Sequence, residues 1–306
     1  MEQHLPTHGN FRRYYGMRSA RAARLHGESV QAPARADERI LSLVAWLATT
    51  ATAVERVLDI GCNAAKPLIE LCQCMESPPK SAIGVDIDPV LIHQAQGALR
   101  KAWSQMRPAG AQRDSHYFPI AFSQLFSPLP FPPHDIQPAF PNTITFYIGD
   151  WQALDRNKKH PLAVEDRRGY DLILGFSLTK WIHLNDGDAG LIQFLARLAK
   201  CLRPGGVVAL EIQPWKSYDQ ARSLSSTLRK AYTALRIRPD DMEWILTSVF
   251  GLQCEGAVGT GGGFGFKRPI LVFRRPRVYD AAYLSAVHAS LAELPAWPWV
   301  MQSPKM

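Results

Sequence analysis

Two short apolar segments, each carrying an aspartate near its end, constrain the fold of this chain more than any other feature. Residues 57–60 include Asp59 and are followed at once by Gly61, and residues 82–85 are followed by Asp86. Continuous apolar runs of this length predict strands buried on both faces of a parallel sheet. Ligands of such sheets bind beyond the carboxyl ends of the strands. The sequence therefore predicts a ligand site lined by Asp59, Gly61 and Asp86.

The pattern around these strands indicates a cofactor that contains a ribose but no phosphate. An acidic residue at the end of the second strand suits a pair of ribose hydroxyls. The loop after the first strand has one glycine, at position 61, where the dinucleotide fingerprint needs three. S-adenosylmethionine meets both conditions. Either aspartate alone could simply cap its strand, but the ordered pair favours the cofactor.

Alternating strand and helix patterns continue along the chain and end in a hairpin. Further strands are expected at 143–148, 170–175, 207–212, 251–256 and 268–273, and helices at 39–47, 68–75, 89–103, 187–202, 221–235 and 239–250. This order predicts an α/β fold of the Rossmann-like class I methyltransferase type, with a seven-stranded, mostly parallel sheet and an antiparallel last strand.

The domain organisation is read from the same patterns. We expect a methyltransferase domain at 36–276, followed by a C-terminal tail at 277–306 that includes a helix at 281–292. Eight of the residues 107–141 are proline and no period is evident there, which predicts an insertion in a loop.

The charge of the chain is compatible with a nucleic-acid partner. The net charge is +8 and the isoelectric point is about 9.3. Basic clusters lie near both ends, and such runs usually form a solvated surface. In the N-terminal cluster, however, arginines alternate with aromatic residues, which favours stacking on bases and pairing with phosphates. We therefore expect residues 1–35 to cover RNA and cofactor. The clusters contain Arg12, Arg13, Arg18, Arg21 and Arg24, and Lys267, Arg268, Arg274, Arg275 and Arg277.

Other partners and compartments are less favoured by the sequence. No apolar run approaches 18 residues, and the N-terminus is polar, so an intracellular protein without a membrane partner is expected. The five cysteines have neither disulfide-framework nor zinc spacing, so no metal is expected.

Side chains after the other strands complete the expected cofactor site. Asp150 could accept a hydrogen bond from an adenine amino group, while Trp151 and Ile87 could enclose the ring. Core packing is an equally good explanation for Trp151. Tyr15 could supply an aromatic face to the sulfonium.

Several longer strings are more specific than the strand-end residues. They are residues 9–18 (GNFRRYYGMR), 58–63 (LDIGCN), 86–88 (DID), 177–185 (SLTKWIHLN), 187–188 (GD), 202–206 (LRPGG), 213–218 (QPWKSY) and 266–269 (FKRP). Together they resemble the bicoid-interacting protein family, whose best-known member type is the RNA methylphosphate capping enzyme. The resemblance covers residues 8–275 apart from the proline-rich insertion.

The resemblance implies methyl transfer from S-adenosylmethionine to the 5′ γ-phosphate of a small noncoding RNA. The alternatives are a methyltransferase for RNA 5′-monophosphates, of the transfer-RNA or pre-miRNA type, and a noncatalytic RNA-binding chaperone of a noncoding ribonucleoprotein. A nuclear monomer, with other ribonucleoprotein subunits as further partners, is the expectation; a cytoplasmic location is the alternative.

The resemblance also implies roles for individual residues. Tyr14, Arg18, Lys180 and His183 match positions near the phosphate or the first nucleotide. A terminal phosphate carries roughly −1.5 to −2 charge at neutral pH, so its oxygen needs alignment rather than a general base. A structural role for His183 is an equally good explanation. Together with Asp59, the expected cofactor-binding residues are Tyr15, Arg39, Gly61, Cys62, Asn63, Asp86, Ile87, Asp150, Trp151 and Phe176.

Overall fold

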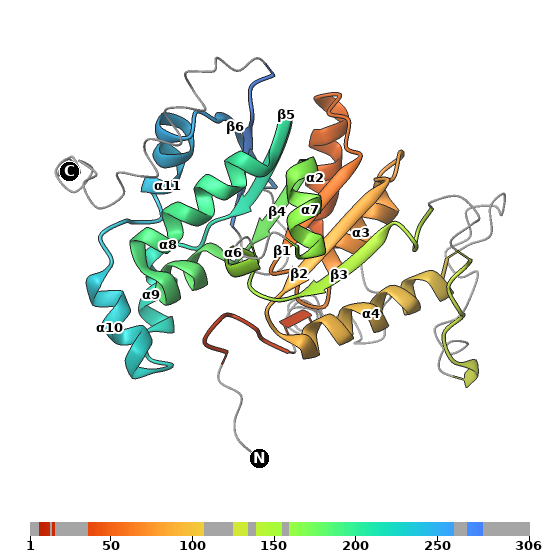
Figure 1. The fold of residues 1–306 in the computed structure, drawn as a ribbon, viewed down its shortest axis with the longest axis horizontal. Helices are drawn as coiled ribbons and strands as arrows, with labels where there is room; N and C mark the ends of the chain where they lie inside the picture. Colours follow the sequence, from red (N-terminus) through yellow and green to blue (C-terminus); the bar gives the residue numbers. More distant parts are fainter. Residues whose placement is uncertain are drawn as a thin grey trace, which may run out of the picture. The chain divides into compact units, whose positions relative to one another are not determined.

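The computed structural model describes residues 6–12, 14–15, 36–106, 125–133, 139–154, 159–259 and 268–277. Within these residues a seven-stranded mixed sheet has the strand order β3-β2-β1-β4-β5-β7-β6 (Figure 1). The strands are β1 (Arg56–Ile60), β2 (Ser81–Asp86), β3 (Ile144–Ile148), β4 (Tyr170–Phe176), β5 (Leu202–Glu211), β6 (Gln253–Val258) and β7 (Ile270–Arg274). Strand β7 is antiparallel to both β5 and β6, whereas β1 with β2, β2 with β3, and β4 with β5 pair in parallel. The predicted fold class is confirmed.

The chain divides into two compact units. The β1–β3 unit comprises residues 11–153 with 263–265, and the β4–β7 unit comprises residues 1–10, 154–262 and 266–306. The β1–β3 unit contains helices α2 (Glu38–Thr49), α3 (Lys66–Cys74), α4 (Pro89–Ser104) and α6 (Trp151–Leu154, which extends one residue past it). The β4–β7 unit contains α7 (Pro161–Arg168), α8 (Thr179–Cys201), α9 (Trp215–Ala221), α10 (Ser226–Ala234), α11 (Asp241–Trp244) and the π-helix η1 (Ile245–Val249).

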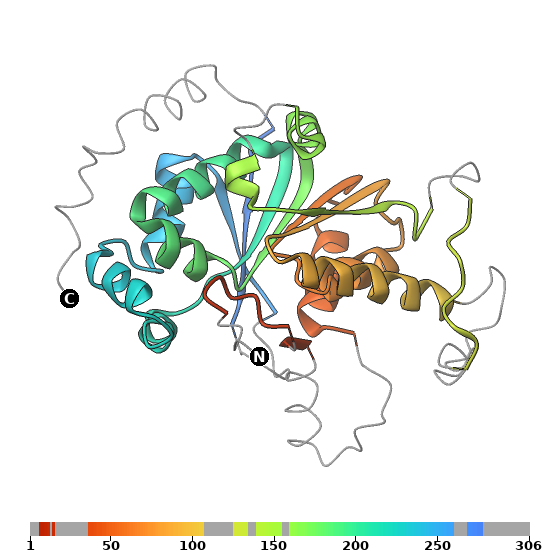
Figure 2. The ribbon, with the colours of Figure 1, turned by 60° about the horizontal axis from the view of Figure 1, so that its bottom comes forward.

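The core of the β1–β3 unit forms from the apolar strands and one face of each helix. Val57, Leu58 and Ile83 are at most 2% exposed. Helix α2 buries Ile40 and Leu43, whose spacing places them on one face, and packs against α3. Helix α4 runs along β2 and β3 (Figure 2). The helices thereby hold the carboxyl ends of these strands in register.

The core of the β4–β7 unit forms around β4, β5 and the long helix α8. Residues 172–174 of β4 have no exposed area, and Leu191, Leu195 and Leu198 make one buried face of α8. Helices α7, α10 and η1 pack against α8. The unit therefore fixes the start of α8 at the end of β4.

Several helices differ from their expected bounds. The helix expected at 239–250 is the short α11 followed by the π-helix η1. The helix expected at 187–202 begins at Thr179, and Gly187, at φ 69°, divides it with a kink. The helix expected at 221–235 begins only at Ser226, as α10, because Ser225 accepts a hydrogen bond from the Leu228 amide (3.1 Å) and caps its start. The preceding helix α9 begins at Trp215, in a stretch for which no helix was expected.

Some expectations fall largely outside the described residues. Of the proline-rich insertion, residues 125–133 and 139–141 are described, and the helix expected at 281–292 is not among the described residues. None of the described helices is long and apolar enough to cross a membrane.

Gly84 of β2 packs closely against Cys62, in the loop after β1, and against Phe146 of β3. A Cβ atom at this position would lie 2.8 Å from Cδ1 of Phe146 and 3.0 Å from Sγ of Cys62. We expect Gly84→Ala to lower the free energy of unfolding by about 1–3 kcal/mol, because the packed neighbours must move. Gly97→Ala in α4 is the control, since nothing lies within 4 Å of its added Cβ. It should stabilise the protein by about 0.5–1 kcal/mol. Denaturant titration of both variants checks this, and equal effects would contradict it.

Candidate active site

The loop after β1 turns sharply at the edge of the β1–β3 unit. Gly61, Asn63 and Ala65 have φ angles of 67°, 52° and 55°, all in the left-handed region. The amides of Gly61 and Cys62 donate to the Val85 carbonyl at 2.8 and 3.1 Å, which ties the loop to β2. Gly61 is exposed and Cys62 is buried. The exposed turn backbone is therefore available for a close approach to a ligand.

Asp86 at the end of β2 holds this loop in place. Its Oδ2 accepts a hydrogen bond from the Asn63 amide (2.9 Å), and its Oδ1 accepts one from the Asp88 amide (2.9 Å). Asp86 is 7% exposed, and burial raises the pKa of its carboxyl group. An ionised carboxylate has about four acceptor positions, so these two bonds leave capacity for ribose hydroxyls.

The residues after β3 lie next to Asp86, as the sequence predicts. Asp86 pairs with Ile148 in the β2–β3 register, and the Gly149 amide donates to the Asp86 carbonyl (2.9 Å). Asp150 is exposed, and its side chain caps the short helix α6. Ile87 is 41% exposed, whereas Trp151 is 3% exposed, which supports the packing explanation for Trp151.

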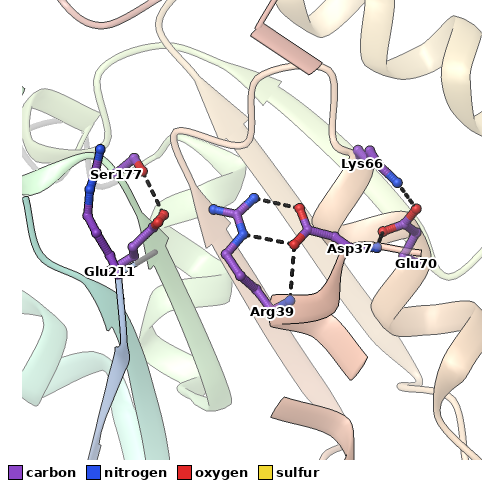
Figure 3. Close-up of polar contacts among 7 residues, drawn as sticks. Asp37, Arg39, Lys66, Glu70, Ser177 and Glu211 are labelled. Carbon is purple, nitrogen blue, oxygen red and sulfur yellow. Dashed lines mark hydrogen bonds and ion pairs between the residues drawn. The ribbon is translucent and has the colours of Figure 1, made fainter. Parts of the chain in front are cut away.

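Four charged residues near the starts of α2 and α3 form a cluster: Asp37, Arg39, Lys66 and Glu70. Arg39 is 7% exposed and donates from Nε and Nη2 to the two oxygens of Asp37, at 2.9 and 2.7 Å (Figure 3). The Asp37 amide in turn donates to Glu70, which pairs with Lys66. The bidentate pair of Arg39 and Asp37 fixes the guanidinium at the start of α2. Asp37 was not among the residues expected to be functional.

Asp59 of β1 is a further acidic residue on which the charge of Arg39 acts. It is 2% exposed, and its Oδ2 has no hydrogen-bond partner among the described residues. Burial raises its pKa to about 8, further increased by the charge of Asp86 and opposed by that of Arg39. A buried acceptor that lacks a donor suits a cationic ligand group. S-adenosylmethionine carries an ammonium and a sulfonium, so this cluster fits the expected cofactor.

Residues near the N-terminus contact this edge. The side-chain amide of Asn63 donates to the Phe11 carbonyl (3.3 Å), and Nε of Arg12 lies 3.5 Å from a carboxylate oxygen of Asp88. Tyr15 is half-buried, and burial raises the pKa of its hydroxyl well above the ordinary value, with the charges of Arg39 and Asp59 acting on it as well. Its ring meets that of Tyr14 edge-on, with centroids 5.1 Å apart.

Those expected residues of the β1–β3 unit that the structure describes therefore gather at one strand edge. Arg18 lies outside the described residues. Cys62 contributes packing rather than a reactive thiol, because burial raises its pKa well above the ordinary value.

In the β4–β7 unit, Gln213 organises the turn between β4 and α8. It is 2% exposed, and its side-chain oxygen accepts from the Thr179 hydroxyl (3.2 Å) and the Lys180 amide (3.1 Å). Its side-chain nitrogen donates to the Ser177 carbonyl. Ser177 has a φ of 57° and donates from its hydroxyl to Glu211 at 2.6 Å (Figure 3). Phe176, directly before this turn, is half-buried.

The Lys180 ammonium is held between a backbone carbonyl and an aromatic ring. Its Nζ donates to the Ser217 carbonyl (3.3 Å) and lies 4.4 Å from the centroid of the Trp181 ring. Burial, together with the positive charge of Arg268, lowers the pKa of Lys180 to about 8. Arg268 itself lies 3.4 Å from the Ser177 hydroxyl. Among the described residues, no carboxylate contacts the Lys180 ammonium.

His183 has a different environment, although it lies one turn further along α8. It has no exposed area. Its Nε2 lies 2.7 Å from Oδ1 of Asp188, and its Nδ1 lies 3.4 Å from the hydroxyl of Tyr218. Asp188 also accepts from the backbone amides of Arg236 and Ile237. These contacts support the structural explanation for His183.

Sequence reasoning missed three residues that shape the site. Gln213 lies in the string at 213–218, whose role could not be read without the fold. Arg268 was noted only as part of a basic cluster. Asp37 was missed because no motif marks it in the sequence. Arg39 was expected to contact the cofactor, and no acidic partner was predicted for it. The described residues include no group of three or more His, Cys, Asp or Glu side chains that could hold a metal ion.

Comparison with known proteins is consistent with this picture. A family model described as bicoid-interacting protein 3 matches residues 170–275. A 7SK snRNA methylphosphate capping enzyme from Mus musculus is 34% identical over 245 residues, which cover 72% of this chain and 36% of that protein. A probable RNA methyltransferase from Arabidopsis thaliana is 31% identical over 225 residues, covering 71% of this chain and 69% of that protein. A pre-miRNA 5′-monophosphate methyltransferase from Xenopus laevis is 27% identical over 293 residues, covering 88% and 92%.

The strand order and the antiparallel β7 define the class I methyltransferase architecture. Within that class, the chain belongs to the bicoid-interacting protein 3 family. It spans about a third of the length of the mouse relative.

The buried carboxyl group of Asp59 leads to a prediction about stability. Its pKa is about 8 in the folded protein and about 3.9 in an unfolded chain, so raising the pH between these values favours unfolding. Asn cannot ionise, and Asp59→Asn should raise Tm at pH 8 by at least ~2–4 °C, the shift that 1 kcal/mol produces in a large domain. The gain should shrink towards pH 5.

Thermal melts across this pH range test the prediction. Asp240→Asn, at an exposed position, is the matched control, and its effect on Tm should not change with pH. A stabilisation by Asp59→Asn that is the same at pH 5 and pH 8 would show that the carboxyl group ionises normally in the folded protein.

Proposed function

We propose that this chain transfers the methyl group of S-adenosylmethionine to the 5′ γ-phosphate of a small noncoding RNA. The observation that carries the proposal is the half-buried ammonium of Lys180, which donates to the Ser217 carbonyl and contacts no carboxylate among the described residues. Burial and the positive charge of Arg268 both disfavour its charged form, so an anion that balances the Lys180 charge is expected to bind there. A terminal phosphate supplies that charge. The names of the mouse and Arabidopsis relatives support RNA as the substrate class.

A monophosphate acceptor is the second candidate. It is favoured by the Xenopus relative, of which this chain covers 92%. A noncatalytic RNA chaperone remains the third candidate, in which the same surfaces bind RNA. We also propose a nuclear location and action as a monomer that meets other ribonucleoprotein subunits through the RNA.

The residues of the β1–β3 unit bind the methyl donor in this proposal. Asp86 holds the ribose hydroxyls, and Asp150 and Ile87 contact the adenine. Asp59 and Tyr15 face the cationic part of the cofactor, and Arg39 keeps the charge of the cluster balanced. When bound, S-adenosylmethionine supplies an activated methyl group. The turn backbone at residues 61–63 allows the cofactor to approach closely.

The residues of the β4–β7 unit hold the acceptor. Lys180 offers a point charge to one phosphate oxygen, and Arg268 can grip two oxygens with its planar fork. From the N-terminal segment, which lies outside this unit in sequence, Arg18 is proposed as a further cation and Tyr14 as a contact to the first nucleotide. The phosphate oxygen is already anionic, so none of these residues has to remove a proton. His183 keeps α8 in position through Asp188 and Tyr218.

Labelled methyl donor tests the proposal directly. The protein is incubated with RNAs that have the same sequence but carry a 5′ triphosphate, monophosphate or hydroxyl. We expect label on the triphosphate RNA, loss of at least ~100-fold in kcat/KM for Lys180→Ala and Asp86→Ala, and no label on the hydroxyl RNA. Label on the monophosphate RNA alone would establish the second candidate. RNA binding without transfer to either phosphate would favour the chaperone.

The pKa of Lys180 predicts how the reaction depends on pH. Lys180 is cationic below about pH 8 and neutral above it, so kcat/KM for RNA should fall as the pH rises through 8. Arg268→Gln removes a neighbouring positive charge. The falling limb should then move to higher pH, while kcat/KM at pH 7 decreases. Lys200→Gln, an exposed position at the other end of α8, is the charge-matched control and should leave the profile unchanged. If kcat/KM of Arg268→Gln still falls at pH 8, the charge of Arg268 does not act on the Lys180 ammonium.

A further inference from the structure

Helices α9 and α10, with the segment after them, carry a large excess of basic residues. Residues 215–238 contain six basic residues and one acidic residue, Asp219, which gives a net charge of +5 for this stretch against +8 for the whole chain. The basic residues are Lys216, Arg222, Arg229, Lys230, Arg236 and Arg238. We call residues 215–238 the α9–α10 platform.

The charges of the platform are largely uncompensated. All of its basic residues except Arg222 are exposed. Arg222 is half-exposed and pairs with Asp219 at 2.7 Å. Among the described residues, no carboxylate pairs with the side chains of the other five. Like charges held together in this way repel one another, and a polyanion would relieve that repulsion.

Aromatic rings hold the platform together and flank its arginines. The ring of Trp215 stacks on Tyr218 and Tyr232, with centroids 4.9 and 4.8 Å apart. The guanidinium of Arg238 lies 4.0 Å from the Trp215 ring centroid, and that of Arg222 lies 4.9 Å from the Tyr232 ring centroid. Stacking on a ring orders a guanidinium, and Nη1 of Arg238 also donates to the carbonyls of Leu235 and Ile237, at 3.0 and 3.1 Å, which leaves its other N–H groups for a ligand. The platform therefore presents oriented cations rather than mobile side chains alone.

The platform is continuous with the proposed phosphate site. The Lys180 ammonium donates to the carbonyl of Ser217, which belongs to α9. The ring of Tyr218, one residue further, meets that of His183 edge-on at 5.6 Å. Helix α10 packs against both α8 and α9, so the three helices lie side by side (Figure 1). An RNA whose 5′ end is at Lys180 can thus reach the platform without leaving the β4–β7 unit.

We propose that the α9–α10 platform binds the phosphate backbone of the RNA nucleotides next to the 5′ end. This rests on the proposed function, because the 5′ phosphate at Lys180 sets where those nucleotides start. Four of the six basic residues are arginines, which suit phosphates through bidentate hydrogen bonds. The contacts are made to the backbone, so the platform adds affinity for longer RNA and little sequence preference.

The double variant Arg229→Glu with Lys230→Glu tests the platform. Both residues are exposed on α10, and neither side chain makes a hydrogen bond or ion pair within the described residues, so the fold should be unaffected. Binding is measured by fluorescence anisotropy, without methyl donor, on a 5′-phosphorylated trinucleotide and on an RNA of about 20 nucleotides, longer than the ~4–16 that a single-strand site covers. We expect at least tenfold weaker binding of the long RNA and less than twofold change for the trinucleotide. The slope of log Kd against log salt should fall by about 1.4, or ~0.7 for each lost phosphate contact.

The double variant Lys101→Glu with Lys200→Glu is the matched control. It makes the same change in net charge at exposed positions of α4 and α8. Its affinity for the long RNA should stay within about twofold of wild type if the effect is local. Equal loss in both double variants, or no loss in Arg229→Glu with Lys230→Glu, would overturn the proposal.

The binding assay also separates this inference from the proposed function. A selective loss of long-RNA affinity supports the platform even if no RNA accepts a methyl group, in which case only the catalytic proposal fails. Conversely, methylation of RNA with unchanged binding by the platform variant would overturn the platform alone.

Discussion

The contact between the Asp86 carboxylate and the Asn63 amide is the interaction on which the candidate cofactor site depends. It joins the end of β2 to the loop after β1 at a distance of 2.9 Å. The loop needs this support, because Asn63 and Ala65 adopt left-handed backbone conformations that are unfavourable for residues with a Cβ atom. A buried carboxylate supplies a charge-assisted acceptor, which is stronger than a neutral one. The acid expected to bind ribose therefore also builds the loop around the ligand.

Burial acts in opposite directions on Asp59 in the β1–β3 unit and on Lys180 in the β4–β7 unit. In the β1–β3 unit it raises the pKa of Asp59 to about 8, which disfavours the negative charge that a cationic ligand would meet. In the β4–β7 unit it lowers the pKa of Lys180 to about 8, which disfavours the positive charge that a phosphate would meet. In each case the ligand proposed for the site carries the charge that restores the ionised form. The ionised form of each group is therefore least favoured when no ligand is bound, as is typical of functional sites.

The sequence predicted the strands and the residues at their ends because buried strands leave a local signal. An apolar run such as residues 57–60 can be read directly, and the residues directly after each parallel strand must lie at the same sheet edge. Contacts between distant residues leave no such signal. Arg268 and Ser177 are 91 positions apart, and their proximity depends on β7 inserting beside β5. The start of α10 at Ser226 was placed too early because a serine cap can be outweighed by a continuous helical pattern. The platform could be recognised only once both helices were placed beside α8.

The first turns of α8 separate ligand binding from structural support. Lys180 and His183 are three residues apart, which places them on neighbouring positions of one helix. Both nitrogens of His183 are engaged, with Asp188 and Tyr218, and Asp188 also accepts two backbone amides from the segment after α10. A histidine that had to move protons would need one nitrogen facing the substrate. A phosphate nucleophile removes that need, since it is anionic before the reaction begins. The buried histidine is therefore compatible with the proposed chemistry, and it holds the α9–α10 platform to the helix that carries Lys180.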